Sequence, residues 1–482
     1  MRNAAPMLSE GDNVWRVVQA DRMAVIVDAD RYFTIARDTF LKAERRILLV
    51  GWDFDARIVL SHEGEGPKPI GEFLYWVVER NPDLHLYLLR WDMGAVKSIF
   101  RGRTLFTILK WMRHPRITVR LDGHHPTGSS HHQKIVSIDD RLAFCGGIDM
   151  TGERWDTSNH ADEDPGRKGP GGKPYKPWHD ATTGVTGEAA RAIAELARHR
   201  WAAAGGGELP PLDVPGSGWP EGLGIDFENA RIGIARTEPA MPDREPVMEI
   251  EKLFLAQIAA ARRWMYCESQ YFASRRIAEA IARRLEEPDG PEFVIVNPLT
   301  AQGWLEPIAM DTARARLVEA LRGRDPHGRL RIYHPYTAGG EPIYVHAKIT
   351  IVDDCSLRVG SANMNNRSLR LDSECDVVID AALQDQPVEP RIEAIRNDLL
   401  AEHLGTTPER VAELLAETGS LIATVEQLRG PGRSLRPYEV PDLPAIQQWL
   451  ADNEVLDPEN PDEMFEPLSG KGLWRGRLGR RK

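Results

Sequence analysis

The sequence lacks any uninterrupted apolar run of the roughly 18 residues that a membrane-spanning helix needs. Its first residues, Met-Arg-Asn-Ala-Ala-Pro, lead directly into polar chain, without the basic-then-apolar pattern of a signal peptide. We therefore expect neither a transmembrane segment nor a signal peptide. These absences favour a cytoplasmic protein whose contact with a membrane, where it has one, is peripheral.

Cysteine is scarce, with four among 482 residues, and no two of them have Cys-x-x-Cys spacing. A zinc site is therefore not expected. Each thiol lies in or beside an apolar, strand-like run, which predicts buried, reduced side chains that behave as small apolar residues. The four are Cys145, Cys267, Cys355 and Cys375.

Positive charge is also in deficit, because 61 Lys and Arg face 72 Asp and Glu, for a formal net charge of −11. Nucleic-acid-binding proteins usually carry a basic face, so we expect no nucleic-acid partner. An anionic substrate must then be attracted by local charge. The composition, 42% hydrophobic and 28% charged, is typical of a globular protein. A chain of 482 residues is longer than those that usually fold around a single hydrophobic core. Two domains are expected.

The chain does contain one motif twice. His132-Gln133-Lys134 and His346-Ala347-Lys348 are each followed by four residues and then by an Asp-Asp pair. The residues between Lys and Asp are mostly apolar and β-branched, which is typical of a buried strand. A glycine turn follows each copy, Gly146-Gly147 in the first and Gly360-Ser361 in the second.

The segments around the motif also repeat in order. An amphipathic helix at 30–46 and an apolar strand at 47–54 correspond to a second helix and strand within 247–272. Two further pairs of strands follow, at 84–89 and 292–296 and at 116–121 and 330–334. Strands alternating with helices predict an α/β fold, here two similar α-β-α lobes packed about a pseudo-twofold axis.

Glycine and proline mark the boundary between the lobes, and helical patterns at 390–403 and 408–417 mark the chain beyond the second lobe. We divide the chain into an N-terminal lobe at 1–204, a Gly/Pro-rich linker at 205–224, a C-terminal lobe at 225–405, and a helical, then loop-rich and basic tail at 406–482.

The paired histidines and lysines suggest phosphodiester chemistry. Residues i and i+2 of a strand face the same side, so His132 and Lys134 are expected to point together, as are His346 and Lys348. If the lobes bring both pairs into one pocket, the lysines can neutralise the phosphate oxygens. One histidine can then attack phosphorus while the other protonates the leaving alcohol. A monomer is sufficient, because both half-sites lie in one chain.

The carboxylates are expected to act in two different ways. Asp139 and Asp353 each lie in an Asp-Asp turn between two apolar runs, where aspartate bonds its own backbone, so we interpret them as structural supports. The groups that orient the histidines are expected further along the chain. Glu374 is the candidate for the second half and Asp156 for the first.

The doubled motif resembles that of the phospholipase D superfamily, and further stretches look like its eukaryotic-type branch. The resemblance spans roughly residues 30–405. Its stretches are Gly51-Trp52-Asp53-Phe54, Gly147-Ile148-Asp149, Arg154-Trp155-Asp156-Thr157, Pro177-Trp178-His179-Asp180, Glu268-Ser269-Gln270-Tyr271-Phe272, Asn366-Arg367-Ser368, Asp372-Ser373-Glu374 and Glu402-His403-Leu404-Gly405.

The resemblance implies roles for single residues. His132 would be the nucleophile that forms a phosphohistidine, and His346 the general acid and then the base. Lys134, Lys348 and Asn363 would hold the phosphate, and no metal or other cofactor would be required. Asp149 stands where some members have Asn, and it receives no phosphate-binding role because a carboxylate cannot donate to phosphate.

The resemblance also implies an activity, the hydrolysis of the distal phosphodiester of glycerophospholipids at a membrane surface. The products would be phosphatidic acid and a head-group alcohol, with transfer to another alcohol when one intercepts the intermediate. A phosphatidyltransferase of the cardiolipin-synthase kind is an alternative, although such enzymes typically carry N-terminal membrane spans. A nucleic-acid phosphodiesterase is a second alternative and a non-catalytic lipid-binding scaffold a third.

For His131 we expect one role, and for three other features two interpretations remain open. His131 is expected to face away from its neighbour and to have a structural use, whereas His179 could line the pocket or be buried and hydrogen-bonded. The insertion at 162–176 could be a rim of the site or a surface loop. The basic segment at 471–482 could contact anionic lipid or remain solvated.

Residues 104–112 form a helix with an apolar stripe, flanked by basic residues. A helix that touches a membrane has this pattern, and so does a helix that turns its apolar side to the core and its basic side to solvent. We favour the core-facing orientation. The flanking residues are Arg101, Arg103, Lys110 and Arg113.

Overall fold

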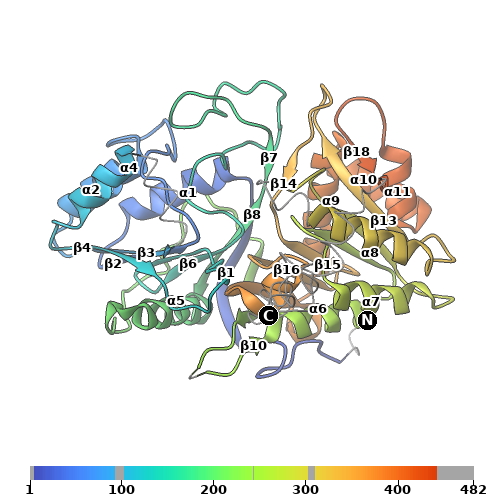
Figure 1. The fold of residues 1–482 in the computed structure, drawn as a ribbon, viewed down its shortest axis with the longest axis horizontal. Helices are drawn as coiled ribbons and strands as arrows, with labels where there is room; N and C mark the ends of the chain where they lie inside the picture. Colours follow the sequence, from blue (N-terminus) through green and yellow to red (C-terminus); the bar gives the residue numbers. More distant parts are fainter. Residues whose placement is uncertain (1–4, 93–101, 243, 302–309, 442–482) are drawn as a thin grey trace, which may run out of the picture.

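The computed structural model describes residues 5–92, 102–242, 244–301 and 310–441. One sixteen-stranded sheet runs through both halves of the protein, in the order β18-β13-β12-β11-β15-β16-β17-β9-β1-β8-β6-β5-β2-β3-β4, with β10 beside β9. Figure 1 shows the N-terminal half in blue and green on the left and the C-terminal half in yellow to red on the right.

The N-terminal half alternates strands and helices before two hairpin strands and a long helix. Its elements are β1 (Arg16–Val27), α1 (Ala29–Leu41), β2 (Arg46–Gly51), α2 (Ile70–Arg80), β3 (His85–Trp91), α4 (Gly102–Trp111), β4 (Ile117–Asp122), β5 (Ile135–Ile138), β6 (Leu142–Gly146), β7 (Trp178–His179), β8 (Ala181–Gly187) and α5 (Glu188–Trp201).

The C-terminal half repeats this order and then adds two helices and a strand. Its elements are β9 (Phe227–Glu238), β10 (Val247–Met248), α6 (Glu249–Ala260), β11 (Trp264–Glu268), α7 (Arg275–Leu285), β12 (Glu292–Val296), α8 (Thr312–Arg322), β13 (Leu330–Tyr336), β14 (Tyr344–Val345), β15 (Ile349–Val352), β16 (Ser356–Gly360), β17 (Glu374–Asp380), α9 (Glu389–Leu404), α10 (Pro408–Thr418), α11 (Leu421–Leu428) and β18 (Ser434–Pro437).

The two halves meet along β1 and β9, which pair antiparallel from Arg16 opposite Ile234 to Met23 opposite Phe227. Outward from this pair, the strand order is equivalent on both sides: β8, β6, β5, β2, β3, β4 on one and β17, β16, β15, β11, β12, β13 on the other. This arrangement fits the expected pseudo-twofold relation. The sequence patterns did not reveal β1 or β9.

Side chains of each strand alternate between two cores. Along β2, Leu48 and Val50 face a core shared by both halves, which α5 and α9 cover. Ile47 and Leu49 face a second core, formed with α1 and α2 within the N-terminal half. A third core joins α6, α7 and α8 to the C-terminal half of the sheet.

Most of the expected elements are present. The helices expected at 390–403 and 408–417 are α9 and α10, and the helix expected at 30–46 ends earlier, as α1, because Arg46 already begins β2. All four cysteines are unpaired, and Cys355 alone is only partly buried. Among the described helices, none is both long and apolar enough to span a bilayer. The basic segment at 471–482 lies outside the described residues.

One expected orientation is wrong. The stripe at 104–112 was expected to face the core, but three apolar side chains of α4 and that of the residue after it are exposed. Only one face of the helix packs against α2 and β4. Periodicity identifies an apolar stripe and says nothing about what covers it. The exposed residues are Leu105, Phe106, Leu109 and Met112.

Candidate active site

The two His-x-Lys segments lie in extended chain just before β5 and β15, and not inside a strand as expected. The backbone of each segment is instead bonded to the opposite half. His132 N donates to Ser373 O at 2.9 Å, and His346 N donates to His179 O at 2.7 Å. Because the segments are held across the interface, the site forms where the halves meet, beside the paired β7 and β14 (Figure 1).

The two motif histidines face each other across this interface. Their ring centroids are 6.5 Å apart and their planes are inclined by 59°. His132 comes from the N-terminal half and His346 from the C-terminal half. A tetrahedral phosphate between two rings at this spacing can receive a nucleophile on one side and a proton on the other.

A buried carboxylate holds each histidine through Nδ1. Both carboxylate oxygens of Glu374 lie 3.0 Å from His132 Nδ1, and Asp180 Oδ2 lies 2.7 Å from His346 Nδ1. A carboxylate at Nδ1 fixes the tautomer and leaves Nε2 to react. The pairs are crossed, because Glu374 belongs to the C-terminal half and Asp180 to the N-terminal half.

The crossing corrects both assignments of histidine-orienting carboxylates. Glu374 was expected to serve His346, in its own half, but it contacts His132. Asp156 was expected to orient His132, but its carboxylate accepts from Trp178 N and contacts His160. A contact between halves leaves no local signal, which is why both assignments failed.

Asp180 was missed, although the repeat itself could have identified it. Asp180 immediately precedes β8, and Glu374 begins β17, which is the equivalent strand of the other half. Aligning the two halves as far as these strands would have placed the two carboxylates at matching positions.

Both lysines lie against the histidine segments. Lys134 Nζ donates to His132 O at 2.7 Å, and Lys348 Nζ donates to His346 O. Both side chains are buried, and burial lowers the pKa of Lys348 to about 7. A bound phosphate would counter this effect by supplying negative charge.

Burial and nearby cations lower the pKa values of both motif histidines. Burial lowers the pKa of His132 well below its ordinary value, and Lys134 and Lys348 add to the effect. Burial likewise lowers the pKa of His346, with Lys348 next in importance. Burial raises the pKa of Glu374 to about 8, so this carboxyl also favours its neutral form near pH 7.

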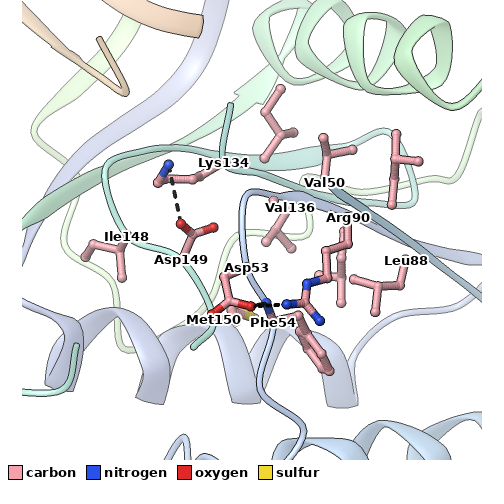
Figure 2. A pocket seen from close by; sticks show the side chains of 14 residues that line it. Val50, Asp53, Phe54, Leu88, Arg90, Lys134, Val136, Ile148, Asp149 and Met150 are labelled. Carbon is pink, nitrogen blue, oxygen red and sulfur yellow. Dashed lines mark hydrogen bonds and ion pairs between the residues drawn. The ribbon is translucent and has the colours of Figure 1, made fainter. Parts of the chain in front are cut away.

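The two halves differ at the position that follows the glycine turn. Asp149 Oδ2 lies 3.3 Å from Lys134 Nζ, whereas the equivalent Asn363 bonds through Oδ1 to Gln270 N at 3.2 Å. Figure 2 shows Lys134 and Asp149 beside a cavity of about 20 Å³, with the Arg90–Asp53 ion pair on its far side. A cavity of this size holds about one water molecule, so it is no substrate site.

The first aspartate of each Asp-Asp pair binds the backbone of a neighbouring turn. The carboxylate of Asp139 accepts from the backbone N–H groups of residues 44, 45 and 46, at the turn that leads into β2. Asp353 accepts in the same way from residues 262, 263 and 264, before β11. Both aspartates have positive φ, 54° and 52°. These contacts fit the structural role expected for them.

The neighbouring histidines have buried partners. His131 Nδ1 lies 2.9 Å from Ser373 Oγ, and burial lowers the pKa of His131 to about 4. His179 is the buried, hydrogen-bonded residue of its two interpretations: its Nδ1 lies 2.7 Å from Glu402 and its Nε2 2.7 Å from Glu268. Neither ring is directed between the motif histidines.

The contacts of His179 extend into a chain of imidazoles and carboxylates that the sequence did not suggest. Glu402 Oε1 lies 3.0 Å from His160 Nε2, and His160 Nδ1 lies 2.9 Å from Asp156. Burial alone would lower the pKa of His160, but the surrounding carboxylates raise it to about 9. These contacts join the two halves next to Asp180, since Glu402 of the C-terminal half contacts both His160 and His179 of the N-terminal half.

An aromatic wall closes the His346 side of the site. The Trp178 ring stacks on Tyr344 at 4.6 Å and lies 5.2 Å from the His346 ring. The guanidinium of Arg154 covers the other side of the indole, 4.2 Å from its centroid. Arg154 Nη1 donates to backbone oxygens, and its buried Nε has no hydrogen-bond partner.

The fold and the crossed site can now be compared with known proteins. The phosphatidylserine synthase of Haemophilus influenzae Rd KW20 superposes with a TM-score of 0.56 at 15% identity, over 85% of this chain and 95% of that one. This structure therefore has the two-lobed fold of that enzyme. Residues 254–395 match the family described as Cardiolipin synthase, PLD-like domain.

Curated relatives are similar to most of the chain. Phospholipase D A of Dictyostelium discoideum is 25% identical over 484 residues, covering 82% of this chain and 37% of the relative. Phospholipase D alpha 4 of Arabidopsis thaliana is 23% identical over 473 residues, covering 75% and 62%. Over most of its length the chain is therefore similar to phospholipases D of the eukaryotic type, and part of its C-terminal half matches a PLD-like domain. It spans less than two thirds of the length of each of these two relatives.

Proposed function

We propose that this protein is a phospholipase D, which cleaves the distal phosphodiester of glycerophospholipids to phosphatidic acid and a head-group alcohol. The observation that carries the proposal is the pair of facing histidines, 6.5 Å apart, each held by a buried carboxylate from the opposite half. Such a pair supplies a nucleophile and an acid to opposite sides of one phosphorus atom.

The first step forms a covalent intermediate. His132 Nε2 attacks phosphorus and the bond from phosphorus to the head-group oxygen breaks. His346, which is protonated in the substrate complex because the negative charge of the phosphate counters the nearby cations, donates its Nε2 proton to that oxygen. The departing product is the neutral head-group alcohol. Lys134, Lys348 and Asn363 hold the non-bridging oxygens and stabilise their developing charge.

The second step regenerates the histidine. His346 now takes a proton from water, the water oxygen bonds to phosphorus, and the bond from phosphorus to His132 Nε2 breaks. Phosphatidic acid leaves. An alcohol in place of water gives a phosphatidyl alcohol by the same step.

The proposed chemistry assigns every role to a side chain of this chain, so no cofactor is required. It also places the protein at the surface of a phospholipid membrane, as a peripheral protein. Activity that survives EDTA would support the first point. Activity that returns only with added calcium would contradict it.

Phosphatidyl transfer is the second candidate, because the family that matches residues 254–395 is described by the name of cardiolipin synthase. Transfer and hydrolysis share the intermediate on His132 and differ only in the acceptor. The proportion of the two products with and without glycerol or phosphatidylglycerol separates them.

Product analysis tests the proposal. The purified protein and its H132A variant are incubated with mixed phospholipids, with and without ethanol, and with oligonucleotides in parallel. We expect phosphatidic acid, phosphatidylethanol where ethanol is present, and neither from H132A. Cleavage of oligonucleotides with intact lipids would contradict the proposal and favour a nuclease.

A further inference from the structure

Helix α4 lies beside α2 in the N-terminal half (Figure 1). Apolar side chains of this helix and of the residue that follows it are exposed. These side chains are large, and their exposed fractions are 73% for Phe106, 62% for Met112, 42% for Leu105 and 41% for Leu109. At about 100° per residue, these positions form one continuous arc of roughly 120° on the helix. Continuous exposed apolar surface usually marks an interaction site.

The opposite face of α4 already anchors the helix, so the exposed arc is not needed for packing. Trp111 is fully buried and its Nε1 donates to Gly71 O at 3.1 Å. Thr104 Oγ1 donates to Asp55 at 2.8 Å. No described residue covers the arc itself. Leu121, 53% exposed, adds apolar surface near the end of β4, the strand on which α4 packs.

Charge indicates the kind of partner. The segment 102–113 contains no acidic residue, although the chain as a whole carries a net charge of −11. Lys110 lies beside the arc and Arg113 follows the end of the helix on the same side as the arc. Lys110 Nζ lies 3.7 Å from the centroid of the Tyr75 ring. Of the other two flanking basic residues, Arg101 lies outside the described residues, and so does the side chain of Arg103. An apolar arc with a basic border is complementary to the interface of an anionic bilayer.

The position of α4 links this face to the site. The first turn of the helix is tied through Thr104 to Asp55, and Asp55 N donates to Met150 O at 3.1 Å. Met150 follows Asp149, the partner of Lys134. The first turn of α4 is therefore connected, through Asp55, to the segment that contains Asp149, the partner of Lys134.

We propose that the apolar face of α4 inserts into the interfacial region of an anionic phospholipid bilayer and docks the protein there. The proposal rests on the proposed lipid-cleaving function for its purpose. Its direct readout, binding to vesicles, does not depend on activity.

Co-sedimentation with vesicles tests the docking. The vesicles contain phosphatidylcholine with or without phosphatidylserine, and the variants are F106Q/M112Q and K110A/R113A. Ile225→Gln removes a 38%-exposed apolar residue outside α4 and serves as the matched control. Because the replaced side chains are exposed, the melting temperature should not change, which excludes a folding defect.

We expect F106Q/M112Q to lower the partition coefficient about tenfold or more, equivalent to about 1.4 kcal/mol per factor of ten. K110A/R113A should weaken binding only where phosphatidylserine is present, and the loss should shrink in high salt. Hydrolysis of a monomeric short-chain phospholipid should be unchanged in both variants, whereas hydrolysis in vesicles should fall.

Three results would overturn the docking proposal. The first is that both α4 variants bind vesicles as well as the wild type does. The second is that vesicle binding is lost only in a truncated variant that ends at Ser469. The third is a wild-type dimer that F106Q/M112Q converts to a monomer without affecting vesicle binding. A wild-type protein that binds vesicles through α4 but cleaves no phospholipid would instead contradict the proposed function alone.

Discussion

Exchanging Glu374 for Gln tests the crossed pairing at the nucleophile. Glu374 Oε1 and Oε2 both lie 3.0 Å from His132 Nδ1, and Oε2 also accepts from Ser361 Oγ. Ser361 Oγ in turn accepts from Cys375 N at 3.1 Å, so its proton is available to Glu374. A glutamine would satisfy this hydroxyl with its carbonyl oxygen and present its NH₂ group to His132.

The size of the effect follows from the tautomer. With an NH₂ group at Nδ1, the neutral His132 ring must carry its proton on Nε2, where the lone pair is needed to attack phosphorus. An amide-for-carboxylate exchange at a catalytic histidine typically lowers kcat by about 10⁴. We expect a loss of about 10³ to 10⁴, or roughly 4 to 5.5 kcal/mol in the barrier.

The pH profile supplies a second readout. Because burial raises the pKa of Glu374 to about 8, the carboxylate form that leaves Nε2 free becomes more populated as pH rises through this value. The wild-type kcat/KM should therefore rise toward pH 8. The E374Q variant should have lost this rise.

Asp180→Asn is the matched variant on the other histidine, because Asp180 Oδ2 holds His346 Nδ1 at 2.7 Å. The assay compares phosphatidylcholine with phosphatidyl-p-nitrophenol, whose leaving group departs without a proton. D180N should recover most of its loss on the second substrate, and E374Q should recover little. Recovery by E374Q alone, or an E374Q rate within about tenfold of the wild type, would refute the crossed assignment.

Three further predictions concern other contacts. Asp139→Ala should lower the free energy of unfolding in urea by about 2–4 kcal/mol, because three backbone N–H groups lose a carboxylate, and an unchanged midpoint would contradict this. Carboxylates raise the pKa of His160 to about 9, so its charged form stabilises the folded protein, fully below pH 6.5. This stabilisation should be lost as pH rises through 9. In thermal melts, the H160Q variant should show a smaller loss of stability over this pH range. Arg154 is among the cations that lower the pKa of His346, so R154Q should shift the alkaline limb of kcat/KM to higher pH, and a limb that stays or moves down would exclude this role.

The repeat and the motif were predictable because each leaves a local pattern. Apolar runs with regular helical spacing between them indicated α1, β2 and their equivalents, and the doubled His-x-Lys identified both half-sites. The strands β1 and β9 were missed. Their polar positions, such as Gln19 and Arg22 in β1, interrupt the apolar run that would mark a buried strand.

Contacts between the halves could not be predicted from local patterns. His132 and Glu374 are 242 positions apart, and His346 and Asp180 are 166 apart. Asp156 was expected to orient His132 as a carboxylate downstream of the first motif, but position along the chain carries no information about which strand edges meet. The predicted orientation of the stripe at 104–112 was wrong for a related reason, because helical periodicity does not identify what packs against an apolar face.

The pairing of β1 with β9 controls both catalytic contacts at once. Glu374 begins β17, which is bonded to β9, and Asp180 precedes β8, which is bonded to β1. Each carboxylate therefore moves with its own half while its histidine belongs to the other. A slip of one residue between β1 and β9 would displace the halves by about 3.4 Å, more than a hydrogen bond tolerates. Both imidazoles would lose their carboxylates together, so the register of the central strands is a requirement of the chemistry as well as of the fold.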